Sequence, residues 1–297
     1  MDKTQEIMEK VRRIELQARR MSTATFAGQY RSGFRGQGLD FDDFREYRAG
    51  DEPRFIDWKV TARTNTPYVR RFHEEREQVL LLVVDASASM NYASAAAQSS
   101  KLDYAALVSA VLAYSAAKNG DKTGLLLYGR EQHFYLPPAK GMKQLMRIIH
   151  EIVSADDGRT DVEPDAVVTE ILKTQRKPTM CFLISDFLTR PDQQAIGKLN
   201  FRHELIPIRL ADPMECELPP GLGSICLQDP ETGNFYNVNM SSAALRQAYN
   251  KAILSHRRDW ETCFSRQGIT LNDIRTDEDF IPVLRSIFTM RSKHFAR

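Results

Sequence analysis

From residue 79 onward, apolar and polar positions form a repeating order of strand-like and helix-like segments. Residues 79–84 are an unbroken apolar run, which is typical of a strand covered on both faces. Strands separated by helices predict a doubly wound, mainly parallel α/β sheet. We expect helices at 101–118, 141–153, 163–174 and 191–199, and strands at 123–128, 133–136, 180–185 and 204–210, with strand 133–136 an edge strand stopped by Pro137 and Pro138.

Residues 211–240 interrupt this order because prolines and glycines are frequent there. Two strand-like runs, 224–228 and 234–238, flank the turn Asp229-Pro230-Glu231-Thr232-Gly233, which favours a hairpin. A helix at 241–266, a strand at 269–274 and a helix at 278–290 complete the pattern. We therefore assign residues 79–297 to one α/β domain with a hairpin insertion near 211–240.

The N-terminal region follows a different pattern. Residues 4–22 place apolar side chains at helical spacing between charges, which predicts an amphipathic helix docked on the main domain. The alternative is a helix that lies on a membrane surface, but acidic residues in this segment reduce the positive charge that such a helix needs. We assign residues 1–26 to this helix. Residues 27–78, punctuated by glycines, are assigned to an irregular extension with short strands, one of them at 68–72.

Composition and charge narrow the choice of partners. The 297 residues carry 41 Lys and Arg against 39 Asp and Glu, a net charge of +2. That balance favours neither nucleic acid nor an anionic membrane. The four cysteines are far apart, which indicates reduced thiols. The N-terminus is charged, and no apolar run is long enough to span a membrane. We expect a soluble, cytoplasmic protein.

Candidate chemistry lies where the buried strands end. Asp85 follows the first strand and is followed by two hydroxyls, Ser87 and Ser89. In open α/β sheets, ligands bind at the carboxyl ends of strands near a topological switch point. Asp186 ends the strand 180–185 in the same way, and Thr160 lies in a loop before a helix. Oxygen ligands of this kind suit a hard divalent cation, such as Mg²⁺, and leave a position for a carboxylate from a partner.

These residues resemble a known motif. Asp85-x-Ser87-x-Ser89 with Thr160 and Asp186 is similar to the metal-ion-dependent adhesion site of von Willebrand factor A domains. The resemblance implies direct contact of Ser87 and Ser89 with the metal, and direct or water-mediated contact of Thr160. It implies that Asp85 and Asp186 hold waters and orient the serines. The cation would be Mg²⁺, or another divalent ion such as Mn²⁺ or Ca²⁺.

Motifs within residues 36–63 make the resemblance specific to one family. These motifs are Gly36-Gln37-Gly38, Phe44-Arg45-Glu46-Tyr47, Gly50-Asp51, Arg54-Phe55-Ile56-Asp57-Trp58-Lys59 and Ala62-Arg63. They resemble the stretch before the A-like domain in a bacterial family catalogued as domain of unknown function 58. The likeness covers roughly residues 30–275. The resemblance implies a partnership with a MoxR-type AAA+ ATPase in folding, assembly or metal-centre maturation of other proteins.

Enzymatic readings fit the residues less well. An Asp at the end of the first strand also begins a phosphatase motif of the haloacid-dehalogenase type, which needs an acid two residues later. Here that position is Ser87. The motifs GxSxG, GxxxxGK[ST] and GxGxxG are absent.

We therefore expect a non-enzymatic, metal-dependent adaptor that binds an acidic side chain of a partner protein. We do not expect it to bind nucleic acid. A Mg²⁺-dependent phosphatase using Asp85 is one alternative. Another is an internal latch in which Asp51 or Asp57 completes the coordination.

Overall fold

The computed structural model describes twelve stretches of the chain. They are residues 3–22, 24–33, 40–48, 51–52, 55–64, 66–73, 78–97, 99–129, 133–155, 164–218, 223–230 and 232–295. Thr160, in the predicted loop before a helix, lies outside them.

The centre of the molecule is a six-stranded sheet in the order β10-β7-β6-β3-β4-β5. All neighbouring strands are parallel except β5, which runs antiparallel to β4. This confirms the predicted doubly wound, mainly parallel α/β fold. The strand bounds are β3 Val79–Asp85, β4 Lys122–Tyr128, β5 Phe134–Ala139, β6 Met180–Ser185, β7 Glu204–Ala211 and β10 Asn272–Arg275.

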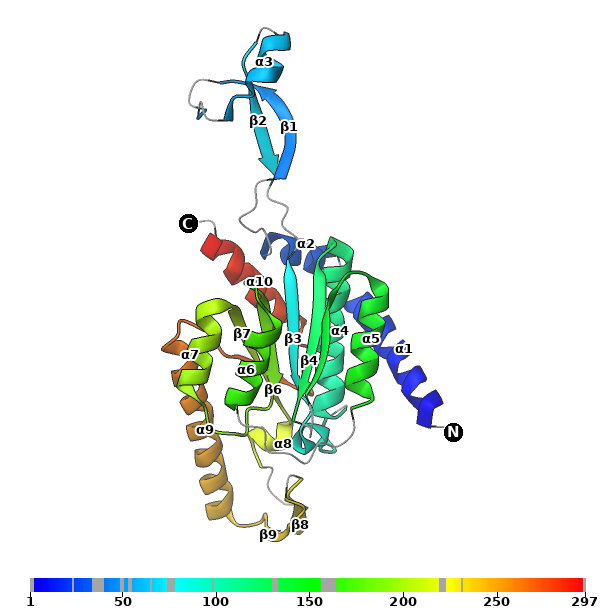
Figure 1. Ribbon diagram of the computed structural model, residues 1–297. Coiled ribbons are helices and arrows are strands. Elements are labelled where there is room, and N and C mark those ends of the chain that lie inside the picture. The colour runs from blue at the N-terminus through cyan, green and yellow to red at the C-terminus, as the bar shows by residue number, and fades with distance from the viewer. Residues whose placement is uncertain are drawn as a thin grey trace.

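Helices cover both faces of the sheet (Figure 1). One face carries α1 (Lys3–Met21), α2 (Ala24–Gly33), α4 (Lys101–Asn119), α5 (Met142–Val153) and α10 (Ile281–Phe295). The other face carries α6 (Pro164–Thr174), α7 (Gln193–Arg202) and α9 (Ala243–Ser265). Because both faces are covered, the central strands β3, β4 and β6 carry long apolar runs, as the run at β3 indicated.

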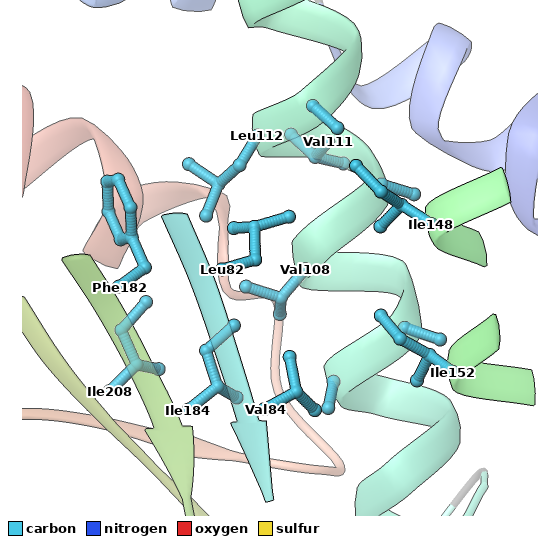
Figure 2. Packing of buried hydrophobic residues seen from close by; sticks show 14 of the residues in the cluster. Leu82, Val84, Val108, Val111, Leu112, Ile148, Ile152, Phe182, Ile184 and Ile208 are labelled. Atoms are coloured by element: carbon cyan, nitrogen blue, oxygen red, sulfur yellow. The ribbon is translucent and has the colours of Figure 1, made fainter. Parts of the chain in front are cut away.

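The larger of the two hydrophobic clusters lies between the sheet and α4, and Figure 2 shows its packing. Strand side chains point from the sheet toward the apolar faces of α4 and α5. Burial of these side chains is the main stabilising contribution to the fold. The labelled residues are Leu82, Val84, Phe182, Ile184 and Ile208 on strands, and Val108, Val111, Leu112, Ile148 and Ile152 on helices.

Two sequence-based boundaries differ from the structure. The edge strand β5 continues through Pro137 and Pro138 to Ala139. It can do so because an edge strand does not need every backbone N–H for pairing. The boundary expected after residue 26 falls inside α2, whose Phe26 and Tyr30 are fully buried in the main core. The N-terminal residues up to α2 thus belong to the packing of the α/β domain.

The segment after α2 forms a separate small unit. Strands β1 (Asp40–Glu46) and β2 (Tyr68–His73) pair antiparallel, with α3 (Trp58–Thr64) between them in sequence. Figure 1 places this unit beyond the amino ends of the sheet strands. A second hairpin, β8 (Ser224–Gln228) and β9 (Phe235–Asn239), follows the short helix α8 (Pro213–Cys216). It projects beyond the opposite, carboxyl edge of the sheet (Figure 1).

Candidate functional site

Asp85 lies at the end of β3 and is held by hydrogen bonds to both of its carboxylate oxygens. The backbone N–H of Ser87 donates to Oδ1 at 2.9 Å, and the Ser185 hydroxyl donates to Oδ2 at 2.7 Å. The side chain is almost fully buried. One bond comes from its own loop and the other from the neighbouring strand β6, so the carboxylate is fixed at the switch point between β3 and β6.

The two serines of the loop present their hydroxyls side by side. Ser87 immediately precedes a short 3₁₀ turn, Ala88–Asn91. Ser87 Oγ and Ser89 Oγ are 3.2 Å apart. Met90, in the same turn, is fully buried in the core and anchors the loop. The turn thus places two neutral oxygen atoms close together next to a buried carboxylate.

Gly129, directly after β4, makes room for this loop. Its φ is +85°, and a Cβ at this position would lie 2.5 Å from Ser87 N and 2.9 Å from Asp85 Oδ1. Both the backbone conformation and the space therefore require glycine. Sequence reasoning did not single out this residue, although a glycine directly after a buried strand is a usable signal for a close backbone approach.

Asp186 follows β6 and is buried beside Lys101. Lys101 Nζ donates to Asp186 Oδ2 at 2.7 Å and to Glu215 Oε1 at 2.5 Å. The lysine side chain has no exposed surface. Asp212, the N-cap residue of α8, accepts from Met214 N, and Glu215 completes a capping box at this turn. The short helix α8 therefore positions Glu215 against the lysine.

The loop after Asp186 is attached to α9. Phe187 adopts a left-handed φ of 54°, which is uncommon for a residue other than glycine. Its ring packs edge-on against Trp260, with centroids 4.7 Å apart, and its carbonyl lies 2.7 Å from His256 Nε2. Trp260 Nε1 also donates to Thr189 O at 3.0 Å. These contacts hold the loop and Asp186 in place.

Burial and charge shift the protonation of the site. Desolvation, and after it the charge of the nearby Asp186, together raise the pKa of Asp85 to about 6, although hydrogen bonds from Ser185 and Ser87 act in the opposite direction. Desolvation lowers the pKa of Lys101, but Asp186 and Glu215 outweigh it, so its pKa lies above the ordinary value. Burial, followed by the charge of Asp85, holds the pKa of Tyr128 well above its usual range. Burial therefore places these ionisable groups where their charges interact strongly.

A cavity of about 230 Å³ opens beside these residues. Ser87, Ser89 and Asp186 line it at one end. Asp85, Ser185, Thr189 and Asp192 also contribute polar groups to the lining. Most of the remaining wall is apolar and comes from β6, β7, α6, α7 and α9, with Val168, Ile171, Leu183, Ala195, Ile196, Leu199 and Trp260 among the lining residues. The candidate site thus adjoins a hydrophobic space on the sheet face opposite to α4.

The structure brings together four of the five residues predicted for the site. Asp85, Ser87, Ser89 and Asp186 line one cavity, whereas Thr160 lies outside the described residues. Within the described stretches, no group of three or more His, Cys, Asp and Glu side chains is placed to hold a metal. A metal here would therefore depend on the serine hydroxyls. Lys101 and Glu215 were not predicted.

The carboxylates proposed for an internal latch are engaged elsewhere. Asp51 pairs with Arg45, with 2.6 Å between Asp51 Oδ1 and Arg45 Nη2. Asp57 Oδ1 accepts from the backbone N–H groups of Lys59 and Val60 at the start of α3. Both lie in the β1–β2 unit, at the end of the sheet away from Asp85 (Figure 1). The structure therefore gives no contact between these carboxylates and the loop at Asp85.

Fold and site together define a doubly wound α/β domain with a polar loop cluster at its switch point. Residues 43–259 match the family described as "Protein of unknown function DUF58", and the chain belongs to this family. An uncharacterized protein of Mycobacterium bovis is 29% identical over 274 residues, covering 91% of this chain and 85% of the relative. An uncharacterized protein of Mycobacterium tuberculosis matches with the same values.

Solved structures show similarity at lower identity. The conserved hypothetical protein BatB from Bacteroides thetaiotaomicron is 13% identical, with a TM-score of 0.44, over 73% of this chain and 99% of that one. A von Willebrand factor type A structure from Catenulispora acidiphila is 11% identical, with a TM-score of 0.41, over 87% of this chain and 51% of that one. In the described parts of this chain, none of the helices has the length and apolar character needed to cross a bilayer.

Proposed function

We propose that this protein is a metal-dependent, non-enzymatic adaptor that binds a partner protein through an acidic side chain. The observation that carries the proposal is the pair of hydroxyls of Ser87 and Ser89, 3.2 Å apart beside Asp85. Mg²⁺ binds oxygen at about 2.0–2.1 Å in an octahedron, so two adjacent ligands lie about 3 Å apart. The serine pair fits that spacing.

The charges around the loop support the same proposal. Asp85, Asp186 and Glu215 carry three carboxylates, and Lys101 carries one ammonium group. A divalent cation at the serines would offset the remaining negative charge, which is costly to bury. Ser87 and Ser89 would hold this cation, with Thr160 as the further hydroxyl. Asp85 orients the loop through Ser87 N, and Asp186 is oriented by Lys101 and the backbone of Leu188.

The bound cation would supply an open coordination position for a carboxylate oxygen. The direct ligands from this chain would be neutral hydroxyls, and no carboxylate of this chain would bind the cation directly, so an acidic side chain from outside could do so. The resemblance of residues 36–63 to the family's upstream stretch supports a MoxR-type AAA+ ATPase as the partner. In that setting the adaptor would act in assembly, maturation or remodelling of other proteins.

The proposal is tested by a pull-down with the MoxR-type ATPase from the same cell, with Mg²⁺ or with a chelator. We expect Mg²⁺ to strengthen binding and Asp85→Ala to abolish this dependence while the protein stays folded. Asp259→Ala, an exposed carboxylate on α9, is the matched control and should keep the Mg²⁺ dependence. Binding that is insensitive both to chelator and to Asp85→Ala would refute the metal bridge.

A further inference from the structure

The cavity beside the candidate metal site is large for a protein interior. Interiors are close-packed, and voids larger than a water molecule are few. Its volume of about 230 Å³ exceeds the roughly 150 Å³ that accommodates a benzene ring in an engineered apolar cavity. It therefore has room for one large aliphatic or aromatic side chain. A concave, mostly apolar space with a few polar groups at one end is the usual form of a binding pocket.

The lining of the cavity has an apolar part and a polar part. Ile171 of α6, Leu183 of β6 and Leu199 of α7 belong to the apolar wall, and the hydroxyls of Ser87 and Ser89 lie at the polar end. Leu188, at the rim, keeps 48% of its surface exposed although it is apolar. An occupant that matches this lining carries a polar group at the serines and an apolar group directly beside it.

Asp192, the acidic residue at the rim of the cavity, repels such an occupant only weakly. Asp192 lines the cavity but caps α7, where its Oδ1 accepts from Gln194 N at 2.9 Å and Ala195 N at 3.1 Å. The N-terminal end of a helix further stabilises its charge. At the polar end, Asp186 is paired with the ammonium of Lys101. The remaining attraction for a carboxylate comes from the cation of the proposed function.

We propose that the cavity receives a large apolar side chain of the partner, adjacent to the acidic residue that binds the metal. The recognised element is thus a two-residue unit, an Asp or Glu beside a Phe, Leu or similar residue. The carboxylate supplies the metal-dependent attraction, and the apolar side chain supplies specificity and further affinity. This inference rests on the proposed function, because the carboxylate is placed by the metal site.

The test uses the full chain with methyl-labelled Ile, Leu and Val, titrated by NMR in excess Mg²⁺ with blocked tetrapeptides. One peptide contains Asp followed by Phe, the second has Gly for the Phe, and the third has Asn for the Asp. We expect the Asp-Phe peptide to bind about tenfold or more tightly than the Asp-Gly peptide, the gain for burying an aromatic side chain. Its signal changes should include the methyl groups of Ile171, Leu183 and Leu199.

Variants then distinguish the contribution of the cavity to peptide binding from that of the metal. Ala195 is fully buried and lines the cavity, so Ala195→Leu fills part of it. This variant should remove the advantage of Phe and leave the Mg²⁺-dependent binding of the Asp-Gly peptide intact. Val168→Leu, a smaller change in the same wall, serves if Ala195→Leu does not fold. Gln194→Leu, exposed on the same helix, is the control and should keep the preference for Phe.

The outcomes distinguish the two ideas. Equal Mg²⁺-dependent binding of the Asp-Phe and Asp-Gly peptides overturns the cavity proposal and leaves the metal bridge standing. A preference for Phe that survives Ala195→Leu also overturns it. Binding of the Asp-Phe and Asn-Phe peptides that is equal and insensitive to a chelator overturns the proposed function itself.

Discussion

Lys101 Nζ lies 2.7 Å from Asp186 Oδ2, and neither side chain has more than 3% of its surface exposed. The first residue of α4 is thus tied to the loop that follows β6, across the carboxyl edge of the sheet. Removing one partner of a buried ion pair leaves an uncompensated charge, which is far more costly than loss of the attraction alone. The pair therefore fixes Asp186 whether or not a cation is bound.

Lys101→Met should lower the free energy of unfolding by about 3–5 kcal/mol, the typical cost of breaking a buried pair. Added Mg²⁺ should restore part of the loss, because a cation at the serines supplies positive charge beside Asp186. Urea denaturation with and without Mg²⁺ measures both effects. Lys118→Met, exposed at the other end of α4, is the control, with an expected loss below about 1 kcal/mol. Equal losses in the two variants would contradict the role given to the buried pair.

Gly129→Ala should damage the site through steric conflict with the loop. Its Cβ would lie 2.5 Å from Ser87 N at a φ of +85°. Gly120→Ala, at a φ of +78° with no atom within 4 Å of the added Cβ, is the matched control. Both substitutions incur backbone strain of about 1–3 kcal/mol, but only Gly129→Ala should also weaken binding of Mn²⁺ by isothermal titration. If the two variants bind Mn²⁺ alike, Gly129 does not shape the site.

The N-terminal helix should contribute stability to the α/β domain. Ile14 of α1 is 4% exposed and belongs to the larger hydrophobic cluster, whereas Leu16 of the same helix is 51% exposed. Ile14→Ala should therefore lower the free energy of unfolding by about 2–5 kcal/mol. Leu16→Ala should change it by less than about 0.5 kcal/mol. A single urea transition with equal midpoints for the two variants would show that α1 is not part of the folded core.

Much of the fold follows from local pattern. Unbroken apolar runs mark strands buried on both faces, and β3 and β6 were placed by them to within a residue or two. Local pattern does not predict an element whose formation depends on tertiary contacts. Residues 24–33 have weak amphipathic character, and α2 forms there because Phe26 and Tyr30 find a buried place against Phe288 of α10.

The candidate site also contains some residues that the sequence predicts and others that it does not. Asp85 and Asp186 could be placed together because each follows a buried strand, and parallel neighbours end at one edge of the sheet. Lys101 could not, because a lysine in the first turn of a helix usually faces solvent. Glu215 carries a local signal, the capping box that begins at Asp212. That signal predicts the short helix but not its buried partner 114 residues away in sequence.

Binding of a divalent cation by the serine pair is tested most directly by calorimetric titration of the purified protein with Mn²⁺ and Mg²⁺. We predict one saturable site in the unaltered chain. The double variant Ser87→Ala with Ser89→Ala should lose at least about 100-fold in affinity, since changes in the groups that merely support metal ligands already cost 10–100-fold. Ser241→Ala, an exposed serine far along the chain, should bind as the unaltered protein does. No measurable binding by the unaltered chain, or equal binding by the double variant, would contradict the account.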